Sequence, residues 1–418
     1  MAYRREPPQN PVEVVHDGDV VVAERGEPLA WTLIGADRVL LTRSPKLHRP
    51  RGPYCLRGAC EGCLARVNGD PNVMTCLHPV QGGEQVDTQN VLGSRSLDVL
   101  RATDFLFPRG MDHHRLLAGV AGVSTVVQKF ARRIAGLGRM PDADLETPAA
   151  RRRDVDVLIV GGGNTGLAVA GELAGLQTLL VDDGPHLGGA LGALAPERVA
   201  ERIGAARAAG AELAPRTTAI ALSREPEAGP GLWALLIDER GATLARAKRV
   251  VLAPGEHDVA LAYEGNDIPG TLSARAALWL WNGGIAAGRK VVLIGNGRYA
   301  DAFANAARGV IDISRVAPEN VIAVNGDSRV SGVVVRDGPK KHKLDADAVL
   351  VDGPGAPAFE LAVQAGAEAP FSPPRGYCPR ASADGQVAPE TWAAGSVLGP
   401  GRVADAARVA AAVQRSLS

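Results

Sequence analysis

Four of the chain's five cysteines lie within 22 residues and have the spacing C-x4-C-x2-C-x12-C; they are Cys55, Cys60, Cys63 and Cys76. Thiolates this close together bind metal, and this spacing favours a [2Fe–2S] cluster with four cysteine ligands. Gly58 and Gly62 lie inside the loop, where they let the backbone wrap closely and turn N–H groups toward the sulfurs. The four cysteines therefore predict one-electron chemistry.

Two other interpretations of the cysteines stay open. A structural zinc site more often has two C-x2-C pairs or a histidine ligand, and here only Cys60 and Cys63 form such a pair. A disulfide requires an oxidising compartment. The fifth cysteine, Cys378, lies far along the chain, and we expect it to be a structural thiol.

A second chemical motif follows an apolar run at residues 155–160. The next residues read G-G-G-N-T-G, which is a G-x-G-x-x-G turn between an expected strand and an expected helix. In such a turn the first glycine allows a tight bend, the second lets a pyrophosphate approach, and the third lets helix and strand pack closely. The predicted binding residues are Gly161, Gly163, Asn164, Thr165 and Gly166.

An acidic residue about 20 positions after this turn normally binds the ribose hydroxyls. Asp182 and Asp183 both lie there, and we assign the role to Asp183 because it is the outer of the two. The alternative is a glycine turn that has only a structural role.

A second glycine turn, G-N-G-R-Y-A, follows the apolar residues 290–294 and contains Gly295 and Gly297. Ala300 replaces the third glycine, and no acid is evident at the end of the following strand. These residues predict a second nucleotide-type half-domain, which either binds a nucleotide at Gly295 and Gly297 or is kept for structure alone.

The elements around these motifs follow from apolar patterning and turn residues. Before the first glycine turn we expect strands at 20–22, 39–41 and 64–69, the last ending in an Asn-Gly turn, and a short helix at 29–34. This order suits a small ferredoxin-like β-grasp domain. A connector over 90–153 has an expected helix at 116–135 and ends in three arginines at 151–153, which we interpret as a solvated boundary. Strands at 155–160, 178–181, 249–253 and 290–294 then alternate with helices, two of which are expected at 167–176 and 402–416.

Composition narrows the function classes. The 46 basic and 46 acidic residues cancel, so no overall charge favours nucleic acid or a membrane surface, and aromatic residues make up only 4%. Residues 1–10 lack the apolar core of a signal peptide, and no run of about 18 apolar residues is present. We therefore expect a cytoplasmic protein without a transmembrane segment and without a nucleic-acid partner.

Five segments resemble the α subunits of multi-subunit flavin-dependent amine and amino-acid dehydrogenases. This family includes hydrogen cyanide synthase, octopine and nopaline oxidases, dye-linked proline dehydrogenases and heterotetrameric sarcosine oxidase. The segments are R-S-P-K-L-H-R-P-R-G at 43–52, P-N-V-M-T-C at 71–76, L-A-P-G at 252–255, G-N-D-I-P-G at 265–270 and A-G-S at 394–396.

The resemblance implies an α/β fold, namely a Rossmann-like flavoprotein with two dinucleotide-binding domains, preceded by an α+β ferredoxin-like β-grasp [2Fe–2S] domain. The implied domains are the cluster domain at 1–89, a helical connector at 90–153, an FAD-binding domain at 154–255 and 351–418, and a shortened second dinucleotide-binding domain at 256–350. Gly255, Gly395 and Ser396 join the implied FAD site.

The resemblance also implies a role as an electron-transfer α subunit in a hetero-oligomer. A flavin-dependent β subunit would oxidise an amine or amino acid, and electrons would pass through flavin to the cluster. The implied cofactors are FAD and a [2Fe–2S] cluster, with FMN at a subunit interface and NAD or ATP in the second domain as further candidates. The amine, the electron acceptor and any catalytic side chain are not evident from the sequence.

Two other functions stay open. One is a stand-alone NAD(P)H-dependent reductase, in which the nicotinamide cofactor would bind at the Gly295 turn. The other is a non-catalytic scaffold subunit with degenerate nucleotide sites. Two departures from the family pattern motivate the scaffold: Ser396 stands in place of an acid and Pro254 in place of a threonine.

Overall fold

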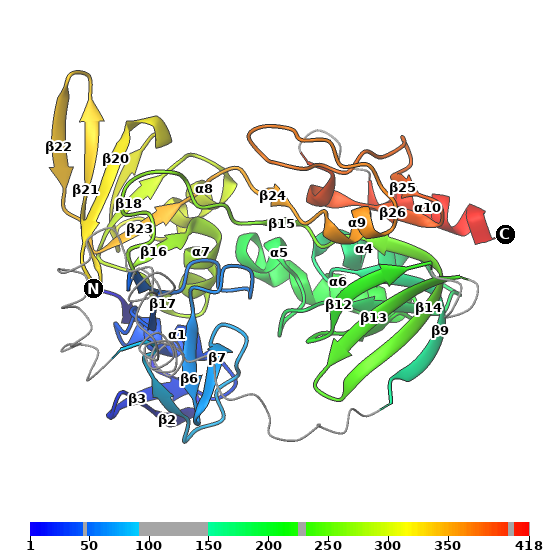
Figure 1. Cartoon of the computed structure of the whole chain (residues 1–418), viewed down its shortest axis with the longest axis horizontal. Coiled ribbons are helices and arrows are strands. Elements are labelled where there is room, and N and C mark those ends of the chain that lie inside the picture. Colours follow the sequence, from blue (N-terminus) through cyan, green and yellow to red (C-terminus); the bar gives the residue numbers. More distant parts are fainter. Residues whose placement is uncertain (45–47, 92–148, 225–230, 400–404, 418) are drawn as a thin grey trace, which may run out of the picture. The chain divides into compact units, whose positions relative to one another are not determined.

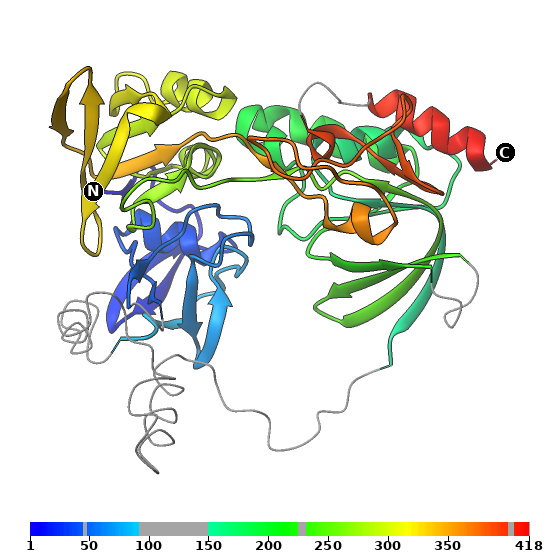
Figure 2. The same cartoon turned by 45° about the horizontal axis from the view of Figure 1, so that its top comes forward.

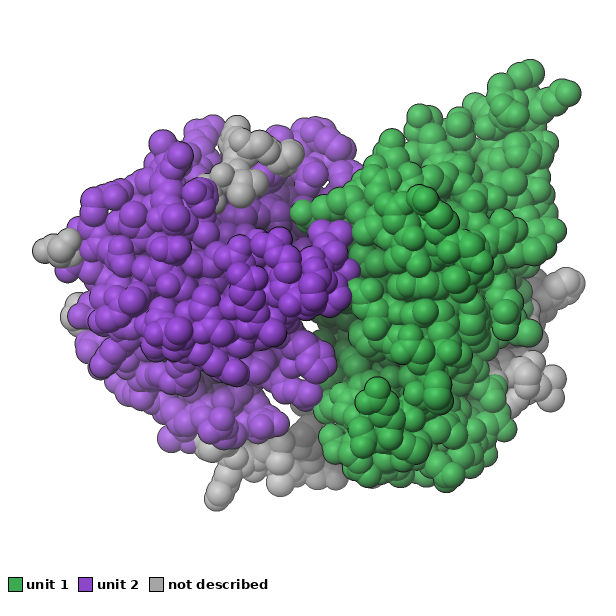
Figure 3. All heavy atoms as spheres, turned by 180° about the vertical axis from the view of Figure 1, so that it is seen from behind, with its two compact units in different colours: residues 1–144, 260–353 green, residues 145–259, 354–418 purple. Residues whose placement is uncertain are grey.

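The computed structural model describes residues 1–44, 48–91, 149–224, 231–399 and 405–417. They belong to two compact units, each made of two stretches of the chain: residues 1–144 with 260–353, and residues 145–259 with 354–418 (Figure 3). The helix expected at 116–135 lies outside the described residues.

The first unit begins with a five-stranded mixed sheet in the order β3-β2-β8-β6-β7, accompanied by helix α1 (Figure 1). Two short strands, β4 and β5, form a separate pair beside it. The element bounds are β2 Pro11–His16, β3 Asp19–Glu24, α1 Leu29–Gly35, β4 Thr42–Arg43, β5 Pro50–Arg51, β6 Leu64–Val67, β7 Asp70–Met74 and β8 Gln85–Asp87.

Side-chain alternation explains this sheet. In β3, Val21 is buried while Val20 and Val22 are exposed, as expected of a strand with one face on a core. The predictions for 20–22 and 29–34 are confirmed, and so is the strand at 64–67 with its turn at 68–69. The strand predicted at 39–41 is wrong: these apolar residues are buried without forming a strand, and the pairing begins only at β4.

The second stretch of this unit has a parallel sheet in the order β16-β23-β18-β19 and an antiparallel meander of β20, β21 and β22. The central strands β18 and β23 are almost entirely apolar and buried, as in sheets covered on both faces. The bounds are β16 Thr271–Ser273, α7 Ala274–Asn282, β17 Ile285–Ala286, β18 Lys290–Ile294, α8 Arg298–Ala306, β19 Asp312–Val316, β20 Val321–Gly326, β21 Val330–Asp337, β22 Lys340–Leu344 and β23 Ala348–Val351.

This second stretch is an abbreviated Rossmann half. Helix α8 crosses between the parallel strands β18 and β19, but only the 3₁₀ turn Pro318–Asn320 separates β19 from the meander. A full half has a second crossover helix after the second strand. In residues 309–326, all of which the structure describes, that helix is absent.

The two stretches of the first unit contact each other directly. Strand β1, Tyr3–Arg4, pairs with β17 in antiparallel fashion. The guanidinium of Arg5 lies 3.7 Å from the centre of the Trp281 ring, and Trp31 packs against Gly283 at the end of α7. The β-grasp domain is therefore anchored on the abbreviated Rossmann half (Figure 2).

The second unit is built on a sheet with the order β11-β10-β9-β14-β13-β12, in which β26 also pairs with β14 and β25. Helix α4 packs against both α6 and α10. The bounds are β9 Arg151–Val160, α4 Asn164–Glu172, β10 Thr178–Val181, α5 Ala190–Leu194, α6 Val199–Ala208, β11 Glu212–Ala214, β12 Thr218–Ser223, β13 Leu232–Asp238, β14 Gly241–Leu252, β15 Glu256–His257, β24 Ala356–Pro357, α9 Glu360–Gln364, β25 Gln386–Ala388, β26 Thr391–Ala393 and α10 Ala406–Leu417, with 3₁₀ turns at Pro196–Arg198 and Gly395–Leu398.

Three predicted elements of this unit need correction. The arginines at 151–153 do not end a connector but begin β9, where Arg151 pairs with Asp238 at 2.8 Å and Arg153 with Glu212 at 2.5 Å. The strand predicted at 249–253 is only the end of the longer β14. The helix predicted at 167–176 ends at Glu172, because the chain turns at Gly175 with φ of 82° before entering β10.

Candidate cofactor sites

The cysteine loop lies between β5 and the β6–β7 hairpin. Cys55 and Cys63 are buried and Cys60 is half-buried, and Cys76 is buried directly after β7. The Thr75 hydroxyl donates a hydrogen bond of 2.7 Å to the Cys63 carbonyl, so the hairpin holds the last two cysteines beside each other. All five cysteines are free, so the structure offers no support for the disulfide interpretation.

The four thiols are arranged as two hydrogen-bonded pairs. The bond from Cys55 lowers the pKa of Cys60 to about 6 because it stabilises the thiolate, and the same bond raises the pKa of Cys55. The bond between the other two cysteines likewise lowers the pKa of Cys63 and raises that of Cys76. The two sulfurs of each pair therefore lie within hydrogen-bonding reach of each other.

This pairing distinguishes the two candidate metals. A [2Fe–2S] cluster with four cysteine ligands places two thiolates on each iron, whereas zinc gathers all its ligands around one point. The arrangement of the four cysteines as two pairs matches two thiolates on each of two irons.

Backbone groups of the loop also face the sulfurs. The Gly58 N–H donates to Cys76 Sγ at 3.2 Å and the Arg57 N–H donates to Cys55 Sγ at 3.5 Å. Gly58 has a φ of 79°, which explains the glycine there. A side chain at Gly62 would overlap the Gly52 carbonyl, so the second loop glycine is required by close packing. N–H groups directed at sulfur are the outer contacts that tune an iron–sulfur cluster.

The first glycine turn joins β9 to α4 in the second unit. Gly161 has a φ of 107°, and a side chain there would overlap the Ala253 carbonyl. A side chain at Gly166 would overlap the Gly161 carbonyl. At Gly163, by contrast, the nearest described neighbour of an added Cβ is Gly189 Cα at 4.0 Å. The turn is therefore tightly packed on its inner side and open at the N-terminus of α4, where a pyrophosphate would approach.

Sequence reasoning named two adjacent acids and chose Asp183, whereas the acid that contacts this turn is Asp182. Asp182 directly follows β10, and its carboxylate accepts hydrogen bonds from the Gly162 N–H at 2.6 Å and the Gly184 N–H at 2.9 Å. Asp183 is exposed one position further on, and its assigned ribose role stays a prediction. The sequence did contain a signal for Asp182. The buried apolar run of β10 ends at Val181, so Asp182 is the first residue after the strand and lies next to the turn.

The remaining predicted FAD residues lie close to this turn. A Cβ at Gly395 would be 2.7 Å from the Thr165 hydroxyl, and a Cβ at Gly255 would be 3.6 Å from the Ser396 hydroxyl. Residues from three distant parts of the chain therefore meet around the start of α4. The hydroxyl of Ser396 occupies the position that the resemblance gives to an acid.

The second glycine turn joins β18 to α8 in the first unit. Gly295 has a φ of 99° and Gly297 is the last residue before α8, as the G-x-G pattern predicts. Asp352, directly after β23, accepts a hydrogen bond from the Ala300 N–H at 2.7 Å. A carboxylate of the chain itself therefore lies at the N-terminus of this helix.

Two of the family-like segments contact each other beside the cysteine loop. Arg51, from the segment at 43–52, forms an ion pair with Asp267, from the segment at 265–270. Arg49 lies 3.8 Å from the same carboxylate. The Ser273 N–H donates to the Tyr54 carbonyl at 3.0 Å, directly before Cys55. These contacts hold the cysteine loop on the abbreviated Rossmann half.

Comparison with known proteins agrees with the site geometry. Residues 9–91 match the 2Fe-2S iron-sulfur cluster binding domain family, which confirms the predicted [2Fe–2S] domain. The chain is 25% identical over 419 residues to the sarcosine oxidase subunit alpha of Rhizobium meliloti (strain 1021), covering 87% of this chain and 41% of that protein. It is 30% identical over 218 residues to the same subunit of Corynebacterium sp. (strain U-96), covering 46% of this chain and 22% of that protein. The chain thus spans less than half the length of these curated relatives.

Solved structures share the fold. The L-proline dehydrogenase from P. horikoshii superposes with a TM-score of 0.75 at 21% identity, covering 99% of this chain and 75% of that one. The thioredoxin reductase from T. acidophilum superposes with a TM-score of 0.52 at 19% identity, covering 64% of this chain and all of that one. The predicted α/β fold with an N-terminal α+β domain is confirmed.

In the described part of the chain, no helix has both the length and the apolar character needed to cross a membrane. The predicted relationship is confirmed by the sequence matches and the cluster domain. The chain is thus similar in sequence to sarcosine oxidase α subunits, and its residues 9–91 match a 2Fe-2S iron-sulfur cluster binding domain.

Proposed function

We propose that the chain is the electron-transfer α subunit of a flavin-dependent amine or amino-acid dehydrogenase or oxidase. In this proposal a separate β subunit oxidises the C–N bond of the substrate, and electrons pass through flavin to a [2Fe–2S] cluster in this chain. The observation that carries the proposal is the presence, in one polypeptide, of two pairs of thiols and an open glycine turn of the FAD type.

The cysteines are the proposed cluster ligands. Cys55 and Cys60 would hold one iron, and Cys63 and Cys76 the other. When bound, such a cluster supplies a site that accepts and releases single electrons. The chain contributes burial and N–H donors: Gly58 and Arg57 point their backbone N–H groups at ligand sulfurs, and both contacts favour the reduced, more negative state.

The residues at the start of α4 are the proposed FAD site. When bound, a flavin supplies the exchange between two-electron and one-electron chemistry. The N–H groups at the start of α4 face the open space beside Gly163, and their partial positive charge suits a pyrophosphate. Asp182 holds the Gly162 backbone in place by its 2.6 Å hydrogen bond, and Thr165, Gly255, Gly395 and Ser396 complete the surroundings.

The partner and the substrate class come from the relatives. Sarcosine and L-proline are both secondary amines, and they appear in the names of a sequence relative and of a structural neighbour. We infer that the substrate is a secondary amine or an amino acid, oxidised at its CH–NH bond on the β subunit. FMN at the interface between the subunits is part of the same proposal. The cytoplasm, where thiols stay reduced, is the proposed location.

The NAD(P)H-dependent reductase is the less favoured function. It requires a nicotinamide cofactor at the Gly295 turn, where the Asp352 carboxylate already accepts the Ala300 N–H. The scaffold hypothesis rests on Ser396 and Pro254. It is less favoured because the primary phosphate turn at Gly163 is open.

The decisive experiment is anaerobic co-purification of the chain with a flavoprotein encoded beside its gene. Absorption spectra, flavin analysis and iron and zinc analysis would follow. We expect about two irons and one FAD in this chain, and sarcosine or L-proline should reduce the cluster in the complex, as seen by electron paramagnetic resonance. The isolated chain should not react with either amine. Colourless protein without iron or flavin would refute the proposal, and bleaching by NADH alone would favour the reductase.

A further inference from the structure

The N-terminus of α8 differs from that of α4, although both follow a glycine turn. We propose that Asp352 closes the second glycine turn to pyrophosphate, so that the abbreviated Rossmann half takes no dinucleotide and serves as a platform for the cluster domain. The proposal concerns a residue in the first unit and stands independently of whether the second unit binds FAD.

The first step is the position of the carboxylate. Asp352 follows β23, the neighbour of β18 in the parallel sheet, so the carboxyl end of β23 brings it beside the turn. Its Oδ2 atom accepts the Ala300 N–H at 2.7 Å. Ala300 is the third residue of α8, and its N–H is one of the groups that an N-cap side chain or a bound phosphate would otherwise satisfy.

The second step is the space at the middle glycine. A Cβ added at Gly297 would lie 2.7 Å from Asp352 Oδ2 and 2.9 Å from its Cγ, so the carboxylate fills the side from which a pyrophosphate approaches. At the equivalent Gly163 the nearest neighbour is 4.0 Å away. The first glycine turn is thus open beside its middle glycine, whereas the second is filled there by a carboxylate.

The third step is charge. A pyrophosphate at the start of α8 would lie beside the Asp352 carboxylate, and two negative groups in contact repel each other strongly away from bulk water. At the first turn the residue in the matching place, after β14 and against Gly161, is Ala253, which carries no charge. The acid there, Asp182, follows the other neighbouring strand, bonds the Gly162 and Gly184 backbone and leaves Gly163 uncovered.

The fourth step is the group that would bind the ribose. In a dinucleotide half-domain this group follows the second strand. Here β19 ends at Val316 and is followed by Ala317 and Pro318, neither of which has a side chain that hydrogen-bonds. The cation at the turn, Arg298, contacts the Tyr299 hydroxyl at 3.0 Å and lies over the Tyr299 ring.

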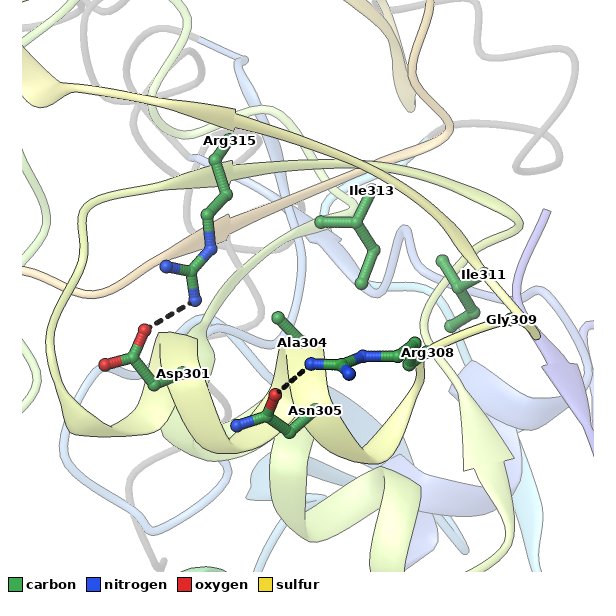
Figure 4. Close-up of a pocket in the computed structure, with 8 residues that line it drawn as sticks. All are labelled: Asp301, Ala304, Asn305, Arg308, Gly309, Ile311, Ile313 and Arg315. Atoms are coloured by element: carbon green, nitrogen blue, oxygen red, sulfur yellow. Dashed lines mark hydrogen bonds and ion pairs between the residues drawn. The ribbon is translucent and has the colours of Figure 1, made fainter.

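A groove on the flank of α8 does not replace the closed site. It has a volume of about 440 Å³ and is lined by residues of α8, of β19 and of the segment between them (Figure 4). Its charged side chains are engaged with neighbours: Asp301 with Arg315 at 2.7 Å, and Arg308 with Asn305 at 2.7 Å. The groove runs along the body of the helix and lacks the glycine turn.

The abbreviated Rossmann half keeps its contacts with the β-grasp domain. Strand pairing of β1 with β17, the Arg5–Trp281 contact and the Arg51–Asp267 ion pair all join the two. These contacts involve α7, β17 and the segment at 265–270, and none of them involves the turn at residues 295–297. A closed nucleotide site is therefore compatible with a role in holding the cysteine loop.

The test is nucleotide binding to the full chain saturated with FAD, measured by titration calorimetry with ADP and with NADH. The wild-type chain should show no binding up to about 1 mM. Asp352→Ser shortens the side chain and removes its charge, and it should bind ADP at least about tenfold more tightly than wild type. Adding Gly297→Val to this variant should abolish the gain.

A matched control is Asp301→Ser, which removes an acid from the first turn of the same helix that pairs with Arg315 and does not cover Gly297, and it should produce no gain. Wild-type binding of ADP or NADH that Gly297→Val removes would overturn the proposal. A folded Asp352→Ser variant that gains nothing would also overturn it. If that variant does not fold, the wild-type titration decides alone. ADP uptake that responds to Gly163→Val reports an FAD site left unfilled and tests the proposed function, not this inference.

Discussion

Arg51 forms an ion pair with Asp267, which lies 216 positions further along the chain. Arg51 belongs to the lead-in of the cysteine loop, and Asp267 belongs to the loop that precedes β16. Both residues lie in segments that resemble the amine dehydrogenase α subunits. The pair therefore gives these segments a physical role, because it fastens the cysteine loop to the abbreviated Rossmann half.

We expect Asp267→Ala to lower the free energy of unfolding by about 1 kcal/mol, since both partners are only partly exposed and Arg49 lies near the same carboxylate. Arg51→Ala should cost a similar amount, and the double variant should cost less than the sum of the two. Urea titration of all four proteins measures this coupling. Arg38→Ala, which breaks the Arg38–Asp19 pair within the β-grasp domain, is the control. Strict additivity at Arg51 and Asp267 would show that the ion pair is not stabilising.

Cys60→Ser should abolish the visible absorption of the cluster and reduce the iron content, because one iron loses a thiolate ligand. Flavin content should stay unchanged, since the glycine turn of α4 is in the other unit. Cys378→Ser is the matched control: that thiol is also buried, but it lies in the second unit and should leave the spectrum intact. A full iron spectrum in Cys60→Ser would exclude Cys60 as a ligand.

Gly163→Val should prevent flavin binding without unfolding the protein. The space beside Gly163 is open among the described residues, so the new side chain meets the ligand and not the protein. Gly204→Val in α6 is the control, because a Cβ there also meets nothing within 4 Å and α6 is not part of the turn. Bound flavin is measured after gel filtration. Equal flavin occupancy in both variants would contradict the proposed site.

Asp182→Ala should weaken flavin binding by about tenfold, because the Gly162 and Gly184 N–H groups lose a charged acceptor and the turn loosens. Asp183→Ala should change the affinity much less, since that side chain is exposed. Fluorescence titration of apoprotein with FAD compares the two variants. A larger loss at Asp183 would support its assignment from sequence and would reduce Asp182 to a structural role.

Gly283→Ala should destabilise the first unit by about 2 kcal/mol through overpacking. The backbone there has a φ of −87°, so no strain arises, but the added methyl would lie 2.8 Å from Cε3 of Trp31. Gly35→Ala is a control at the same contact, because its methyl would meet Ile285 at 3.6 Å, an ordinary distance. Thermal unfolding monitored by Trp fluorescence compares the stability of the two variants. A neutral Gly283→Ala would mean that Trp31 moves aside freely.

Local sequence patterns were sufficient to predict which kinds of cofactor the chain could bind. The cysteine spacing predicted a cluster domain, and the Gly161 turn directly after a buried strand predicted a dinucleotide fold, because both depend on residues adjacent in sequence. The strands of the β-grasp domain were harder to predict. Strand β2 was missed although it lies inside the sheet between β3 and β8, and the strand at 39–41 was wrong because these buried apolar residues precede the pairing, which begins at β4.

Contacts between distant residues required the tertiary structure. No spacing rule indicates that Asp352 would reach the N-terminus of α8, 52 positions from Ala300, because only the pairing of β23 with β18 brings it there. The same holds for Arg51 with Asp267. The amino-acid sequence by itself determined which groups could bind metal and phosphate, through spacing along the chain. The tertiary structure alone decided which of the two glycine turns is open, because strand pairing brings Asp352 beside the Gly297 turn and Ala253 to the matching place beside the Gly163 turn.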